Sequence, residues 1–205
     1  REGVYGGDRE LSSAEVRHVN SVRATTPVRT AVDLACLSGG AGALSAVEGF
    51  MRKCGVTTEE LLVQLPRHRG RRGVIQARRV VSAASAESAS AGESWTKWSI
   101  LEAGLPRPVQ QWEVDLEGWG RAILDFAYPE LLVAVEYDGR EFHGPADRCR
   151  DEARRAALRE AGWVVVVVRA EGLGARGREA WLGALRTAIA ERAPRHRRTY
   201  PPKTP

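Results

Sequence analysis

Three carboxylates interrupt the most hydrophobic stretch of the sequence, LDFAYPELLVAVEYDGREFH at residues 124–143. Asp125 lies in the first apolar run, and Glu136 and Asp138 end the second. Burying an unpaired charge is so costly that acids in such a segment need a partner or a function. Mg²⁺ suits this donor set, because it usually takes one or two carboxylates together with water and a substrate phosphate. The stretch therefore predicts a cation site that meets a phosphate.

Pleating predicts that the three acids leave the same side of a sheet. Side chains alternate along a strand, so Glu136 and Asp138 share one face. A hairpin that turns at residues 129–130 places Asp125 opposite Ala134 and diagonal to Glu136. Two unpaired carboxylates that close would repel, and a divalent cation would relieve the repulsion. The alternative is structural: acids at strand ends are often solvated or paired with an arginine.

Residues 82–92 are mostly small and polar, and we interpret them as the boundary between two halves of the chain. The elements that position the acids follow this segment. The pattern predicts a helix over 91–103, strands over 109–116, 121–128 and 131–137, a helix over 146–161, a strand over 163–169 and a helix over 177–191. Three strands joined by short turns indicate an antiparallel meander. The continuous apolar run WVVVVV is typical of a strand covered on both faces. The predicted class is α/β, with helices packed on a mixed sheet.

The first half is predicted to be mainly helical, with helices over 27–37, 42–53, 57–66 and 74–84. Thr26 before Pro27 and Thr57 before Glu60 are helix-start patterns. The predicted domains are a helical region over 1–88, a second domain over 89–191 and a basic, Pro-rich, disordered tail over 192–205. The arginine-rich turn at 67–72 is interpreted as a solvated loop, with contact to a nucleic-acid backbone as the alternative.

Composition excludes several classes. The five basic residues of the tail account for the whole formal charge of +5, so basicity says little about the folded part. No apolar run approaches the roughly 20 residues of a membrane helix. Three cysteines without a CxxC pattern favour a reducing, cytoplasmic location. The GLGARG sequence at 172–177 lacks a following strand, so no nucleotide cofactor is expected.

The second half also resembles a known family. In order it contains Glu93-Ser94, GLPRPVQQ, DFAYP, VEYDGREFH, DEARRAAL and GWVVVVVR. These motifs resemble the PD-(D/E)XK nuclease superfamily, and more closely the uncharacterised bacterial proteins grouped with very-short-patch-repair endonucleases. The resemblance implies a restriction-endonuclease-like core: a helix, a three-stranded antiparallel meander, a helix and a strand. It also implies that TTPVRTAVDLA follows a mostly missing, antitoxin-like N-terminal region.

The resemblance implies roles for individual residues. Glu93, Asp125 and Glu136 fall where the superfamily places its acids for Mg²⁺ or Mn²⁺. Asp138 replaces the lysine that often follows the second acid, and His143 becomes the candidate general acid or base, as histidine is in the very-short-patch-repair relatives.

Two further residues are expected near the site. Gln111, on the first strand, could bind metal-site water or DNA. In the implied fold the helix over 146–161 lies beside the active site, and Arg154 is the arginine favoured to hold a phosphate.

Three functions remain open. The leading hypothesis is a magnesium-dependent DNA endonuclease or nicking enzyme that hydrolyses phosphodiester bonds. The alternative is a catalytically inactive, DNA-binding regulator related to abortive-infection antitoxins. The third is an interaction module without a nucleic-acid role.

Overall fold

The computed structural model describes residues 10–139 and 145–193. The chain divides into two compact units, Arg1–Trp98 and Ser99–Pro205. The division falls inside helix α5 (Ala91–Glu102), whereas the sequence places the boundary at residue 88. The predicted tail lies outside the described residues from residue 194 onward.

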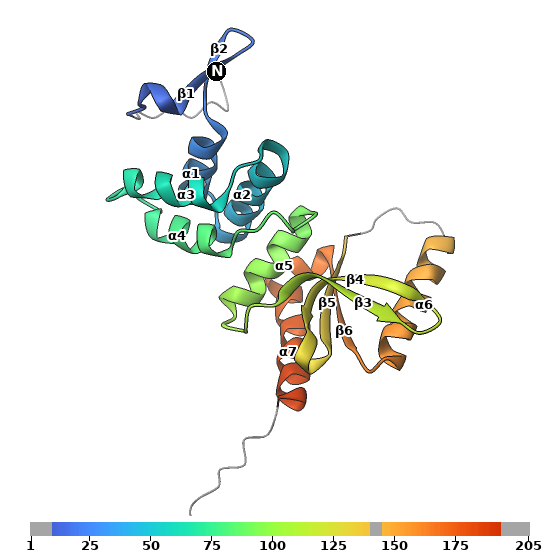
Figure 1. Ribbon diagram of the computed structural model, residues 1–205. Coiled ribbons are helices and arrows are strands. Elements are labelled where there is room, and N and C mark those ends of the chain that lie inside the picture. Colours follow the sequence, from blue (N-terminus) through green and yellow to red (C-terminus); the bar gives the residue numbers. More distant parts are fainter. Residues whose placement is uncertain (1–9, 140–144, 194–205) are drawn as a thin grey trace, which may run out of the picture. The chain divides into compact units, whose positions relative to one another are not determined.

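The first unit is a small helical assembly preceded by a β-hairpin (Figure 1). Its elements are η1 (Ser13–Glu15), β1 (Val16–Val19), β2 (Val22–Thr25), α1 (Pro27–Leu37), α2 (Gly40–Cys54), α3 (Thr58–Gln64), η2 (Leu65–His68), α4 (Val74–Ala83) and the first part of α5. The four predicted helices are all present, and the core between them is built from fully buried alanine, valine and leucine side chains.

Local capping explains where two of these helices begin. The Thr26 side chain accepts a hydrogen bond from the Arg29 amide, and Pro27 occupies the first turn of α1. Thr57 and Glu60 form a reciprocal capping box at the start of α3. Each arrangement satisfies amide groups that the helix itself leaves without partners. Both predicted helix starts are confirmed.

A glycine holds the turn before α4 against α1. Gly73 has a φ of +83°, and a Cβ placed on it would lie only 2.0 Å from the backbone oxygen of Cys36. The approach is backbone to backbone, so no side-chain movement can relieve the overlap. Only glycine fits here, which fixes the end of the arginine-rich turn against the C-terminal part of α1.

Two buried ionic networks stabilise the first unit. Glu48 on α2 and Lys97 on α5 are both 0% exposed and form an ion pair, and Glu48 also accepts hydrogen bonds from the Ser94 hydroxyl and the Ser85 amide. Removing water from charges is costly, so such a pair is sustained only where every charged atom finds a partner.

The second network surrounds Arg29, which is 1% exposed. Its guanidinium contacts Glu15 and Asp33, each at 3.0 Å. Asp33 also contacts the buried ring of His68 at 3.1 Å, and Gln64 donates to Glu15. The network joins the segment before β1 to α1, α3 and η2.

The second unit is a mixed four-stranded sheet in the order β3-β4-β5-β6. Its elements are the end of α5, β3 (Val109–Leu116), β4 (Gly120–Tyr128), η3 (Pro129–Leu131), β5 (Val133–Asp138), α6 (Pro145–Glu160), β6 (Val164–Arg169), η4 (Ala170–Leu173) and α7 (Ala175–Arg192). The first three strands are antiparallel neighbours, and β6 pairs parallel with β5. The predicted α/β class, meander and mixed sheet are confirmed.

Helices cover the two faces of the sheet separately (Figure 1). On one face, Phe126 and Val135 pack with Ile100 of α5 and with Leu182 of α7. On the other face, buried residues of β3, β4 and β5 pack against Leu158 of α6. Because both faces are covered, the strands are rich in apolar residues throughout.

The β4–β5 register differs from the predicted one. Ala127, rather than Asp125, lies opposite Ala134. The connection is longer than a turn at 129–130, since Pro129–Leu131 form a 3₁₀ turn and Leu132 adopts a left-handed backbone with φ +48°. The shift of two residues keeps side-chain parity and brings Asp125 toward Glu136.

Within the described part of the chain, none of the helices combines the length and apolarity that crossing a membrane requires.

Replacing Lys97 with methionine should leave Glu48 buried without its cation. We expect this variant to lose about 3–5 kcal/mol of unfolding free energy, as for other broken buried pairs. Urea denaturation followed by circular dichroism measures the loss. The control is Arg121→Met, which breaks an exposed pair with Glu113 and should cost less than about 1 kcal/mol. Equal losses would contradict a structural role for the buried pair.

Glu15 should make stability depend on acid pH. Burial alone would raise the pKa of Glu15, but hydrogen bonds from Ser12, Gln64 and Arg29 outweigh it and lower the pKa from 4.5 to about 2. The ionised form therefore stabilises the fold fully above pH 4.5, and this contribution is lost as the pH falls toward 2. Melting temperatures measured across that range should fall less steeply for Glu15→Gln than for the wild type. Parallel curves would show that Glu15 does not contribute.

Candidate functional site

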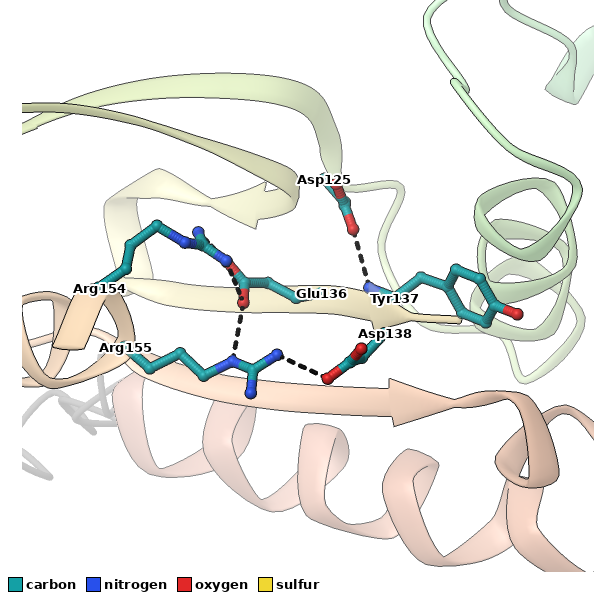
Figure 2. A pocket seen from close by; sticks show the side chains of 6 residues that line it. All are labelled: Asp125, Glu136, Tyr137, Asp138, Arg154 and Arg155. Carbon is teal, nitrogen blue, oxygen red and sulfur yellow. Dashed lines mark hydrogen bonds and ion pairs between the residues drawn. The ribbon is translucent and has the colours of Figure 1, made fainter. Parts of the chain in front are cut away.

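The three predicted acids line one small pocket. It is bounded by six residues: Asp125, Glu136, Tyr137, Asp138, Arg154 and Arg155 (Figure 2). Glu136 and Asp138 come from β5, Asp125 from β4, and the two arginines from α6. The sheet thus supplies the negative charges and the covering helix supplies the positive ones.

An irregularity in β3 and β4 turns Asp125 toward this pocket. The β3–β4 register skips one pair, Gln111 with Asp125, and Gln111 has a left-handed φ of +48°. Leu124 and Ala127 consequently pack in the same core cluster although they are an odd number of residues apart. The strict alternation expected of a strand is therefore broken beside Asp125.

Asp125 is anchored at the end of the β4–β5 ladder. The last paired residues are Phe126 and Val135, and continuing that register places Asp125 beside Glu136. Beyond this pair, a side chain links the two strands: the Asp125 carboxylate accepts a hydrogen bond from the Tyr137 amide at 2.8 Å. The side chain thereby fixes the separation of the two strands where the acids meet.

Two arginines hold Glu136. Arg154 donates from Nη1 to Oε1 at 2.5 Å and from Nη2 to Oε2 at 2.9 Å, a bidentate arrangement (Figure 2). Arg155 donates from Nε to the same Oε2 at 3.3 Å. Glu136 is only 4% exposed, so these contacts compensate for lost hydration. We call Arg154 and Arg155 the arginine pair.

Arg155 also joins the two acids of β5. Its Nη2 donates to Asp138 Oδ2 at 3.0 Å. Burial would lower the pKa of Arg155, but its hydrogen bond to Asp138 and the charge of Glu136 raise that pKa beyond its ordinary value. Arg155 is therefore a permanent cation, placed between Glu136 and Asp138.

The size of the pocket limits what can enter it. Its volume is about 90 Å³. Pockets that enclose a drug-sized ligand measure roughly 300–1,000 Å³. The space suits an ion with some water, or one group that projects from a larger substrate.

The other predicted site residues are placed differently. Glu93 belongs to the first unit, where its carboxylate accepts hydrogen bonds from the Ala89 amide at 2.8 Å and the Ser90 hydroxyl at 2.9 Å. It therefore caps the start of α5. His143 lies outside the described residues. Gln111 lies across from Asp125 in the register, and Arg154 reaches the pocket but is bound to Glu136.

Sequence reasoning missed the role of Arg155. Leu158 is fully buried against the sheet, so residues three and four positions earlier lie on the same face of α6. These residues are Arg155 and Arg154. The spacing could have identified both arginines, whereas the mixed charges of the helix obscured it.

The chemical type of the available ligand atoms, carboxylate oxygens, is the type that magnesium binds. Asp125 and Glu136 supply the one or two carboxylates that Mg²⁺ usually takes from a protein. Among the described residues, however, no three acid, histidine or cysteine side chains gather as a ready metal cage. Both oxygens of Glu136 already accept guanidinium hydrogen bonds, so a cation at Glu136 would compete with the arginine pair.

Comparison with known proteins finds relatives but no assigned activity. Two uncharacterized proteins of Mycobacterium tuberculosis, from strains CDC 1551 / Oshkosh and ATCC 25618 / H37Rv, are each 33% identical over 156 residues. The match covers 76% of this chain, and the chain spans 58% of the length of each relative. No protein-family model matches the sequence, and no solved structure matches it.

Replacing Arg155 with methionine should destabilise the second unit. The change removes the cation shared by two partly buried acids, and we expect a loss of about 3 kcal/mol. The matched control is Arg159→Met, at an exposed position one turn further along α6, which should change stability by less than about 0.5 kcal/mol. Urea denaturation at constant ionic strength, followed by circular dichroism, checks both values. Similar losses in the two variants would contradict the bridging role of Arg155.

Proposed function

We propose that the chain is a metal-dependent DNA endonuclease or nicking enzyme. The observation that carries the proposal is the convergence of Asp125 and Glu136 from neighbouring strands on one polar pocket, next to two arginines. Carboxylates are suited to a divalent cation and guanidinium groups to phosphate oxygens. The small volume favours chemistry on a group that projects from a polymer, such as a phosphodiester.

Asp125 and Glu136 would hold Mg²⁺ or Mn²⁺. When bound, the cation supplies polarisation of the scissile phosphate and a water with a lowered pKa. Asp125 is pre-positioned for this role because the Tyr137 amide fixes one of its oxygens. Glu136 must first release at least one hydrogen bond to the arginine pair.

A substrate phosphate would then be a second possible hydrogen-bond acceptor for Arg154. Its two donors match a phosphate in the same bidentate geometry that they now make with Glu136. Arg154 would exchange the carboxylate for a phosphate as the carboxylate takes up the cation. Arg154 and Glu136 would each keep a partner of opposite charge throughout this exchange. Binding of the cation and binding of the substrate would therefore be coupled.

Proton transfer remains with residues suggested by the resemblance. Asp138 occupies the usual lysine position and is held by Arg155. His143 is the proposed general acid or base, in the segment that follows β5. Glu93, which the resemblance places among the metal-binding acids, would assist Asp125 and Glu136, and in the first unit its carboxylate caps α5.

Nicking of supercoiled plasmid DNA tests the catalytic proposal. With Mg²⁺ or Mn²⁺ the wild type should convert the plasmid to the open circle, and EDTA should stop the reaction. Asp125→Asn and Glu136→Gln should reduce the rate at least about 100-fold, because each removes a ligand charge without changing size. Glu113→Gln, which alters an exposed acid on β3, should leave the rate unchanged.

Melting curves of all variants establish that they are folded. Nicking that persists at the wild-type rate in both site variants would assign the activity to a contaminant. No nicking by the wild type with either metal would end the catalytic proposal.

A second function is favoured by one observation. The arginine pair already compensates Glu136 and Asp138, so the site is electrostatically satisfied by the protein itself. This arrangement fits a DNA-binding regulator that has lost catalysis. Such a protein should bind duplex DNA in EDTA, with equal affinity in the wild type and in Asp125→Asn. DNA binding that requires both Mg²⁺ and Asp125 would favour the enzyme instead.

A further inference from the structure

We propose that the first unit contains a phosphate-binding pocket formed by three arginines. Arg29, Arg67 and Arg71 line a cavity of about 300 Å³. The other lining residues are Glu10, Leu11, Ser12 and Glu15. The proposal is independent of the acid-lined pocket between β4, β5 and α6.

Arg29 offers a buried hydrogen-bond donor without an acceptor. Its Nε donates to Asp33 at 3.0 Å, and its Nη1 donates to Glu15 at 3.0 Å and to the Glu10 carbonyl at 3.3 Å. Its Nη2 is buried and has no hydrogen-bond partner among the residues that the structure describes. An unsatisfied buried donor costs about 1–3 kcal/mol, and more when it is charged. Nη2 is closed to water in this arrangement, so an anion in the adjoining cavity would reach this donor only if the cavity wall moved, and it would first meet Arg67 and Arg71.

The neighbouring carboxylates do not neutralise the other two arginines. Glu15 accepts hydrogen bonds from Arg29, from the Gln64 amide and from the amide and hydroxyl of Ser12. Its oxygens are therefore fully engaged. Among the described residues, no carboxylate makes an ion pair with Arg67 or Arg71. The cavity thus presents two arginines whose charge is available to a ligand.

The turn that carries Arg67 and Arg71 is fixed in place. His68, between them in sequence, is 1% exposed and contacts Asp33 and the Gln64 carbonyl. The Arg71 amide donates to the His68 carbonyl at 3.0 Å, and Gly73 anchors the end of the turn against α1. A ligand would therefore meet arginines carried on an ordered backbone, which lowers the part of the entropic cost of binding that comes from ordering the turn.

Phosphate is the ligand chemistry that fits. Guanidinium groups bind phosphate through paired N–H donors, and three of them can surround a group with three or more oxygens. The cavity is about three times the volume of the acid-lined pocket, so it can admit a phosphate together with part of the molecule that carries it. The phosphate can belong to a free phosphorylated compound or to a nucleic-acid backbone.

Titration calorimetry of the full chain tests the pocket. Inorganic phosphate, a nucleoside monophosphate and a duplex oligonucleotide are titrated separately in EDTA, so that divalent cations at Asp125 and Glu136 contribute nothing. We expect saturable binding of at least one of these probes. Arg67→Ala and Arg71→Ala should each weaken it at least tenfold.

The same turn provides matched controls. Arg69→Ala and Arg72→Ala remove equal charge from residues that do not line the cavity, and they should change affinity less than twofold. Binding of free phosphate or nucleotide assigns the site to a small molecule, and selective binding of the duplex assigns it to a backbone phosphate. Equal weakening in all four variants, which would indicate diffuse attraction, or no binding of any probe, would overturn the proposal.

Discussion

A carboxylate that leaves water must be compensated, and this requirement organises both units of the protein. Glu15, Glu48 and Glu136 are each less than a tenth exposed, and each is met by a cation from another element. In every case the partner comes from a helix remote in sequence. Replacing water around a charge is possible only where the packing is already complete, so these contacts select one arrangement of helices over others of similar apolar burial.

The same compensation has different chemical consequences in the two pockets. At Glu136 the arginine pair saturates the acid, so a cation can enter only by exchange. At Arg29 the acids satisfy part of the guanidinium, and one of its nitrogens has no acceptor within the described ranges 10–139 and 145–193. In the acid-lined pocket the charges of Glu136 and Asp138 are therefore paired with arginines of the same chain. In the arginine-lined pocket, by contrast, a guanidinium donor is left unsatisfied among the described residues. The linings differ accordingly: three acids and two arginines line the acid-lined pocket, whereas three arginines and two glutamates line the other.

Features encoded by neighbouring residues could be predicted, and those that depend on distant backbone geometry could not. The order of elements, the caps at Thr26 and Thr57 and the mixed sheet follow from local patterns. The β4–β5 register does not, because it depends on a left-handed Leu132, and leucine has no preference for that conformation. The broken alternation at Asp125 likewise depends on Gln111. For Glu93 a local pattern was available: Ser90 precedes it by three residues, a spacing typical of a helix cap.

The arginine pair has an evolutionary consequence. Losing Glu136 would remove the carboxylate that Arg154 binds, and losing Asp138 would remove one of the two acids that Arg155 binds, so selection for folding alone would favour retaining both acids. A lineage that gave up catalysis would keep both acids for as long as it kept Arg154 and Arg155. The four positions are thus expected to vary together among relatives, as a charge-balanced set. Conservation of the EYD sequence would consequently report maintenance of this charge-balanced set and not, by itself, an activity.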